Sequence, residues 1–225
     1  NAVVLLAAGS LKGAFIPLLA GFHQQSGIRV EAHFGPAGLL RERIEGGAAC
    51  AVFASANRQH PQALRQTGRA GECYSFARNQ LMLTARRAAC DDRADWLALL
   101  TNPQLRLATS TPGCDPSGDY TWQLFERIEA RFPGCGSAMM ARAQQLVGGR
   151  QSLSVPPGET AGAWLIREGL TALFIGYAHY ASQMTMADDL RTVTIPAPWN
   201  IQADYQQPTL DESAGAQRLC RFILG

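Results

Sequence analysis

The chain of 225 residues carries 20 basic and 18 acidic side chains, a formal net charge of +2, and 47% of its residues are hydrophobic. This composition excludes a disordered chain, and every apolar stretch is shorter than the roughly 18 residues of a membrane-spanning helix. The charges are spread along the chain without a basic block or an acidic tail, so nothing in their pattern indicates binding to nucleic acid.

The first part of the chain alternates short strand-like runs with amphipathic helices, the pattern of an α/β protein. The expected strand and helix pairs are, in chain order, 3–7 with 11–25, 29–34 with 39–45, and 52–55 with 61–67. Glycine ends two of these helices, at Ser26-Gly27 and at Gly46-Gly47.

The remainder of the chain continues the alternation with longer loops. We expect strands at 80–85, 105–109, 173–177, 191–195 and 201–205. We expect helices at 96–100, 120–131, 138–145, 159–168 and 213–224. Asp115-Pro116 is a favourable helix start, since aspartate caps a helix and proline suits its first position.

Four loops rich in glycine, serine and proline come directly before helices. The first turn of a helix has unpaired N–H groups and a partial positive charge, so it binds a small anion without lysine or arginine. Tyr177, at the end of a strand, adds a phenol donor. The sequence therefore predicts an anion site built from backbone and hydroxyl donors at the loops 9–10, 36–38, 115–118 and 157–160.

Each of these residues also has an ordinary structural explanation. Ser10 is a typical N-cap, and residues 35–38 form a tight turn in many proteins. Ser117 follows a capped helix start, and a tyrosine at the end of a strand is more often part of the core. The residues alone leave both interpretations open.

Six motifs nevertheless follow one another in a specific order, namely AAGSL, FGPAGLLRERIEGG, VFASAN, FARNQLMLTAR, DPSGDY and ALFIGY. In this order and spacing they resemble the periplasmic molybdate- and tungstate-binding proteins of ABC importers, over nearly the whole chain. The resemblance implies an α/β fold of two lobes, a venus flytrap in which each lobe is a mixed sheet flanked by helices. Residues 1–80 and 203–225 are expected to form lobe I and residues 81–202 lobe II, joined by hinge strands near LMLTA and IPAPWNIQ.

The resemblance also implies a function. The protein is expected to be periplasmic, or otherwise extracytoplasmic, and monomeric. It is expected to capture a tetrahedral oxyanion, molybdate or tungstate, between its lobes and to deliver it to a membrane ABC permease. No catalysis, cofactor, resident metal or nucleic-acid partner is implied.

The ligand-binding residues that the resemblance implies are Ser10, Ala37, Gly38, Ser117, Glu159, Thr160 and Tyr177. Ser10 matches a serine that donates from its hydroxyl and its N–H group, and Ser117 matches a backbone donor. Ala37 stands where the family usually has a second serine, so one hydroxyl is missing while the N–H group remains. The carboxylate of Glu159 would repel a dianion unless it points to water.

A site made only of donors suits this ligand chemically. Molybdate and tungstate are fully deprotonated at neutral pH, whereas hydrogen phosphate carries a proton that requires an acceptor. An unsatisfied buried group costs about 1–3 kcal/mol, so such a site disfavours phosphate.

Other functions remain possible from the sequence. In one alternative, the ligand is another small anion, or it is a ferric ion held by Tyr177, His179 and Tyr180. In a second, Cys114 and Asp115 act with His179 as an enzyme's nucleophile and base. In a third, the chain is a sensory oxyanion-binding domain, although it contains no recognisable output module.

The six cysteines lack the CxxC spacing of a zinc site, and their even number permits disulfides in an oxidising compartment. The loops around Cys114 and Cys135 flank one expected helix, which makes this pair the preferred candidate. The chain begins without the charged and apolar regions of a signal peptide, so we expect such a peptide to be removed or never present. Its end falls inside a helical pattern, as though a further segment followed.

Overall fold

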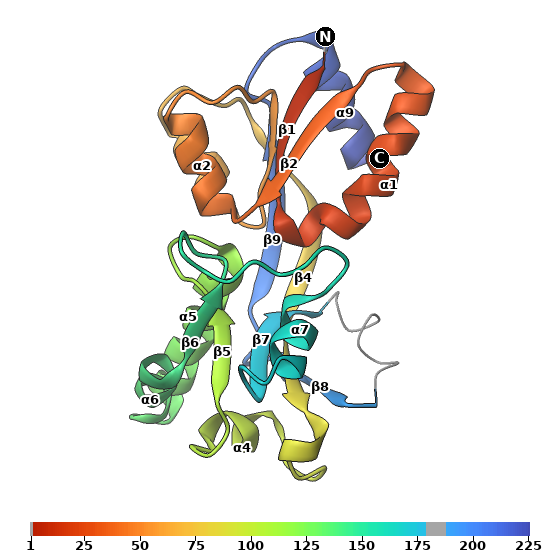
Figure 1. Ribbon diagram of the computed structural model, residues 1–225. Helices are drawn as coiled ribbons and strands as arrows, with labels where there is room; N and C mark the ends of the chain where they lie inside the picture. Colours follow the sequence, from red (N-terminus) through yellow and green to blue (C-terminus); the bar gives the residue numbers. More distant parts are fainter. Residues whose placement is uncertain (1, 179–187) are drawn as a thin grey trace. The chain divides into compact units, whose positions relative to one another are not determined.

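The computed structural model describes residues 2–178 and 188–225 (Figure 1). The chain divides into two compact units, Asn1–Arg78 with Ala203–Gly225 (unit 1) and Asn79–Gln202 (unit 2). Two paired strands, β4 (Cys73–Arg86) and β9 (Gln202–Pro208), continue from one unit into the other. In the described part of the chain, no helix is both long and apolar enough to cross a membrane.

Unit 1 is built on a parallel sheet of strand order β2-β1-β3. Its strands are β1 (Val3–Ala8), β2 (Val30–Gly35) and β3 (Val52–Ala54). Its helical segments are η1 (Gly9–Leu11), α1 (Lys12–Ser26), α2 (Ala37–Glu45), α3 (Gln59–Gln66) and α9 (Ala214–Leu224). Figure 1 shows α2 on one side of β1 and β2, with α1 and α9 on the other. The central strand is therefore covered on both faces, which explains its continuous apolar run VVLLAA.

Unit 2 contains a mixed sheet of strand order β6-β5-β7-β4-β8. The strands that complete it are β5 (Leu107–Ser110), β6 (Gln144–Val147), β7 (Leu173–Tyr177) and β8 (Leu190–Thr194). Its helical segments are η2 (Arg87–Ala89), α4 (Trp96–Thr101), α5 (Pro116–Arg131), α6 (Cys135–Arg142) and α7 (Ala161–Arg167). Strand β5 runs parallel to β6 and β7, while β4 runs antiparallel to β7 and β8.

The core of unit 2 explains why its helices form where they do. In α5 the fully buried apolar side chains are Leu124, Phe125 and Ile128, which share one face at helical spacing. In α7, Leu165 packs in one cluster with Phe174 of β7. These apolar faces, rather than helix propensity alone, fix the two helices to the sheet.

The sequence-based prediction of a helix at 138–145 was wrong for its last three residues. Helix α6 ends at Arg142, and Gln144–Val147 forms strand β6, which pairs with β5. The run QQLV is too short to show a period, so its pairing with a distant strand decides its structure. The strand expected at 80–85 is also longer than predicted, since β4 begins at Cys73.

Candidate functional site

Three loops of unit 1 start at the same edge of its sheet. The strands β1, β2 and β3 are parallel, and Ala8 pairs with Gly35 while Ala7 pairs with Ala54. The carboxyl ends of these strands therefore meet, which is where open α/β sheets bind ligands. The loops that follow lead to Ser10, to Ala37 and Gly38, and to Ser55.

Ser10 lies in η1, and its hydroxyl is 2.9 Å from the hydroxyl of Tyr205. The N-cap residues of η1 and α1 are Ala8 and Leu11, and neither helix start has a side-chain cap hydrogen bond among the described residues. The structure therefore does not support the interpretation of Ser10 as a simple N-cap. Its half-buried hydroxyl instead belongs to a tertiary contact at the sheet edge.

Ala37 and Gly38 form the buried first turn of α2. The N-cap of this helix is Pro36, whose side chain cannot accept a hydrogen bond. Since the first N–H groups of a helix have no partner within it, this turn presents donors at the edge that also carries Ser10. The missing hydroxyl of Ala37 does not remove these backbone donors.

In unit 2, Ser117 lies in the first turn of α5, whose N-cap is Asp115. The Oδ1 atom of Asp115 accepts a long hydrogen bond of 3.4 Å from the Ser117 N–H group, and its Oδ2 atom accepts from the Ser110 hydroxyl. Burial raises the pKa of Asp115 to about 6, against the lowering effect of these two hydrogen bonds. The expected backbone donor therefore already faces a carboxylate from its own loop.

Glu159 and Thr160 precede α7, where Thr160 is the N-cap. The Glu159 N–H group donates to the carbonyl oxygen of Pro156 at 3.1 Å. The residue is exposed, as expected for a side chain that points to water. Its backbone donor thus has a partner within the loop.

Tyr177 is the last residue of β7, pairs with Leu81 of β4 and is buried. Strands β5, β6 and β7 are parallel, so Tyr177 and the loops that lead to Ser117 and Thr160 all follow the carboxyl ends of neighbouring strands. The structure therefore gathers the predicted residues of unit 2 at one edge of its sheet, as it does in unit 1.

Only some of the residues proposed for a ferric or catalytic site lie in the described part of the chain. His179 and Tyr180 lie outside the described residues. Cys114 is buried, and its sulfur accepts a hydrogen bond of 3.5 Å from Arg150. Within residues 2–178 and 188–225, no group of three His, Cys, Asp or Glu side chains could hold a metal ion.

The preferred disulfide, Cys114 to Cys135, was wrong. Both cysteines are free, as are the other four, all of which lie in the described part of the chain. The two loops flank α5 at opposite ends, and its 16 residues span about 24 Å at a rise of about 1.5 Å per residue. A disulfide needs Cα atoms within about 7 Å, so this helix keeps the two cysteines apart.

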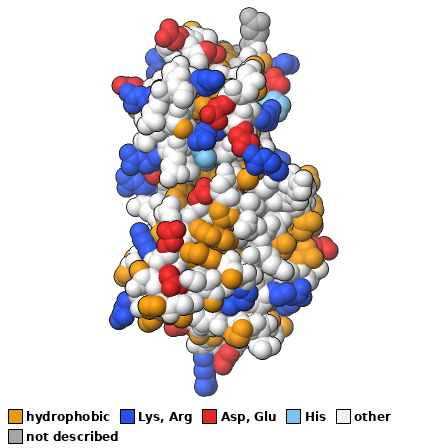
Figure 2. All heavy atoms as spheres, turned by 90° about the vertical axis from the view of Figure 1, so that its left-hand side faces the viewer, with side chains coloured by type: hydrophobic (Ala, Val, Ile, Leu, Met, Phe, Trp, Pro, Cys, Tyr) orange, Lys and Arg blue, Asp and Glu red, His pale blue; other side chains and the backbone are white. Residues whose placement is uncertain are grey.

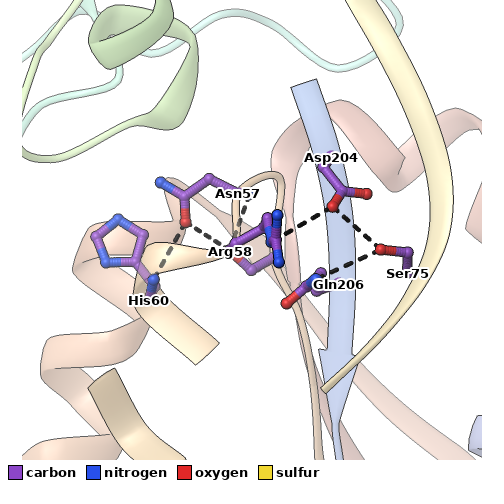
Figure 3. Close-up of polar contacts among 7 residues, drawn as sticks. Asn57, Arg58, His60, Ser75, Asp204 and Gln206 are labelled. Carbon is purple, nitrogen blue, oxygen red and sulfur yellow. Dashed lines mark hydrogen bonds and ion pairs between the residues drawn. The ribbon is translucent and has the colours of Figure 1, made fainter. Parts of the chain in front are cut away.

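The sequence interpretation missed a polar cluster in unit 1, drawn in Figure 3. Asp204 Oδ2 accepts from the Ser75 hydroxyl at 3.1 Å and forms an ion pair with Arg58 at 3.6 Å. Gln206 donates to the same serine at 3.4 Å. The motif VFASAN marked the loop that contains Arg58, but no local pattern could place β9 beside it.

Over the face shown in Figure 2, acidic and basic side chains are interspersed.

Residues 3–225 match the profile of the bacterial extracellular solute-binding protein family, and the chain belongs to this family. A curated relative is an uncharacterised protein of Pasteurella multocida (strain Pm70). It is 40% identical over 202 residues, which cover 89% of this chain and 84% of the relative. Family membership identifies a solute-binding protein that acts outside the cytoplasm.

Three solved structures show the same fold at low sequence identity. The periplasmic molybdate-binding protein of Azotobacter vinelandii has a TM-score of 0.72 and 20% identity, with 98% of this chain and 90% of that chain covered. The sulfate-binding protein SubI of Mycobacterium tuberculosis has a TM-score of 0.73 and 15% identity, with 100% and 82% covered. Iron-bound HitA of Pseudomonas aeruginosa has a TM-score of 0.69 and 13% identity, with 100% and 80% covered. The chain thus has the two-lobed fold of periplasmic binding proteins, as predicted.

Proposed function

We propose that the protein binds a tetrahedral oxyanion, molybdate or tungstate, and delivers it to a membrane ABC permease. The observation that carries the proposal is the edge of the unit 1 sheet, where the Ser10 hydroxyl and the first-turn amides of α2 come together. In unit 2, the phenol of Tyr177 at the carboxyl end of β7 is the further donor in this proposal. Molybdate and sulfate are bound by two proteins of the same fold, which supports this class of ligand.

The carboxylate of Asp115 bears on the choice of anion. It is already hydrogen-bonded to Ser110 and Ser117, so it acts as a helix cap rather than as an acceptor for a ligand proton. The proposed site therefore offers donors to an anion that only accepts, which favours molybdate and tungstate over hydrogen phosphate.

We expect molybdate or tungstate to raise the melting temperature of the protein, whereas phosphate does not. A ligand at 100 times its Kd stabilises the folded state by about 2.7 kcal/mol, which a thermal-shift assay detects. Sulfate and ferric citrate serve as comparison ligands in the same plate. Equal stabilisation by phosphate, or stabilisation by ferric citrate alone, contradicts the proposal.

Replacing Ser10 by alanine is expected to weaken oxyanion binding strongly. Hydrogen bonds to charged groups contribute about 1.5–3 kcal/mol. At about 1.4 kcal/mol per decade, Ser10→Ala therefore weakens affinity roughly 10- to 150-fold in a calorimetric titration.

Tyr177→Phe is the companion variant from unit 2, because it removes a donor with little loss of volume. A matched control is Ser26→Ala in α1, where the hydroxyl donates to the Phe22 carbonyl oxygen at 2.6 Å. The control is expected to change the melting temperature only. Unchanged affinity in both Ser10→Ala and Tyr177→Phe would show that these residues do not form the site.

A further inference from the structure

Tyr205 of β9 is a hydrogen-bond partner of Ser10, although the two residues are 195 positions apart. Their hydroxyl oxygens are separated by 2.9 Å. Tyr205 is only 2% exposed, whereas Ser10 is half-buried at the edge of the unit 1 sheet. A buried phenol thus contacts the hydroxyl on which the proposed oxyanion site depends.

The ring of Tyr205 packs against one aromatic side chain of unit 1, which in turn packs against another. Phe76 of β4 meets it edge-on, with ring centroids 6.1 Å apart and an interplanar angle of 81°. Phe15 of α1 packs in turn against Phe76, at a centroid distance of 5.9 Å. Aromatic packing of this kind orients the ring and so restricts the position of the phenol oxygen.

The geometry allows either hydroxyl to donate, and the acidity of the phenol favours donation by Tyr205. A phenol, with a pKa near 10, is a stronger acid and a better donor than an aliphatic alcohol. When Tyr205 donates, the Ser10 oxygen accepts, and the O–H group of the serine donates to an acceptor other than Tyr205. A hydrogen bond received by an oxygen also polarises its O–H bond and strengthens it as a donor.

We propose that Tyr205 is a positioning residue for oxyanion binding, which donates to Ser10 Oγ and so directs the serine O–H group to the ligand. This proposal rests on the proposed function. It assigns to β9, which the sequence analysis predicted only as a strand next to a hinge, a part in the affinity of the site. Tyr205 itself does not touch the ligand in this scheme.

The test is a double-mutant cycle of Tyr205→Phe and Ser10→Ala, with sodium molybdate as the titrant. Tyr205→Phe keeps the ring and its packing, and it is expected to weaken molybdate binding roughly 3- to 10-fold, as for the loss of one hydrogen bond. In the Ser10→Ala background the same change is expected to have less than about a twofold effect, since its partner is absent. The matched control is Tyr74→Phe, which removes an exposed phenol that donates to Glu72 at 2.8 Å.

Each outcome of the cycle decides the proposal. If Tyr205→Phe weakens molybdate binding only when Ser10 is present, the proposal is supported. A merely structural role of Tyr205 would instead lower the melting temperature and weaken binding equally in both backgrounds. Equal effects of Tyr205→Phe in both backgrounds, or none in either, overturn it. The wild-type protein is titrated with molybdate before any variant is made, and it can fail to bind at that stage. That result overturns the proposed function, and this inference with it.

Discussion

Between pH 6.5 and pH 4, the lowered pKa of His60 is expected to remove about 3 kcal/mol of stability, because the unfolded chain takes up a proton that the folded protein does not. Its side chain is 7% exposed, and neither ring nitrogen has a hydrogen-bond partner among the described residues. Burial, followed by the charge of Arg41 on α2, lowers the pKa of His60 from 6.5 to about 4. The carboxylates of Glu45 and Glu42, also on α2, oppose this shift.

The sign follows from which state binds the proton more readily. Between pH 6.5 and 4 the unfolded chain protonates its histidine while the folded protein keeps His60 neutral. Protons therefore favour the unfolded state. The contribution of neutral His60 to the free energy of unfolding is complete above pH 6.5 and is lost as the pH falls through about 4. Asp115 acts in the opposite direction, since its raised pKa causes a loss of stability as the pH rises from 3.8 through about 6.

A variant separates these opposing contributions. The stability of His60→Leu relative to the wild-type protein is expected to increase by about 3 kcal/mol between pH 7 and pH 4 in urea unfolding, while Asp115 contributes equally to both proteins. The control is His33→Leu, which removes an exposed histidine that lies 3.0 Å from Glu31. A stability difference between His60→Leu and the wild-type protein that is the same at both pH values would show that His60 titrates normally.

Gly148→Ala is expected to destabilise the protein by about 2–5 kcal/mol, from backbone strain and overpacking together. Gly148 has a φ of +77°, in the left-handed region that disfavours a side chain. An added Cβ atom would lie 2.1 Å from Ser110 Oγ and 2.7 Å from Asp115 Oδ2. These two atoms form the hydrogen bond that holds the cap of α5, so the N-terminus of this helix must shift.

The control for this variant is Gly113→Ala. Gly113 also has a positive φ, of +83°, but an added Cβ atom would meet nothing within 4 Å. Its cost is therefore strain alone, about 1–2 kcal/mol. Urea unfolding measures both variants, and calorimetry with molybdate is expected to show weaker binding for Gly148→Ala. Equal destabilisation by the two substitutions would mean that the contacts of Gly148 with Ser110 and Asp115 are unimportant.

The sequence by itself determined the local architecture of the protein. Continuous apolar runs such as VVLLAA predict strands covered on both faces, and glycine or proline before a helix predicts where its free N–H groups lie. These are properties of neighbouring residues, so the strand and helix pairs of unit 1 and the position of Ser10 at a sheet edge could be read directly. The order of six motifs further indicated the solute-binding class, which the family match supports.

Only the tertiary structure decided which distant residues meet. Strand β9 brings Tyr205 to Ser10 and Asp204 to Arg58, β5 recruits Gln144–Val147 as a strand, and α5 separates Cys114 from Cys135. The Asp115 cap over the Ser117 amide likewise depends on the folded loop. Sequence periodicity reports the face that a residue presents within its own helix or strand. Strand pairing and buried hydrogen bonds instead depend on packing between segments that no local pattern relates.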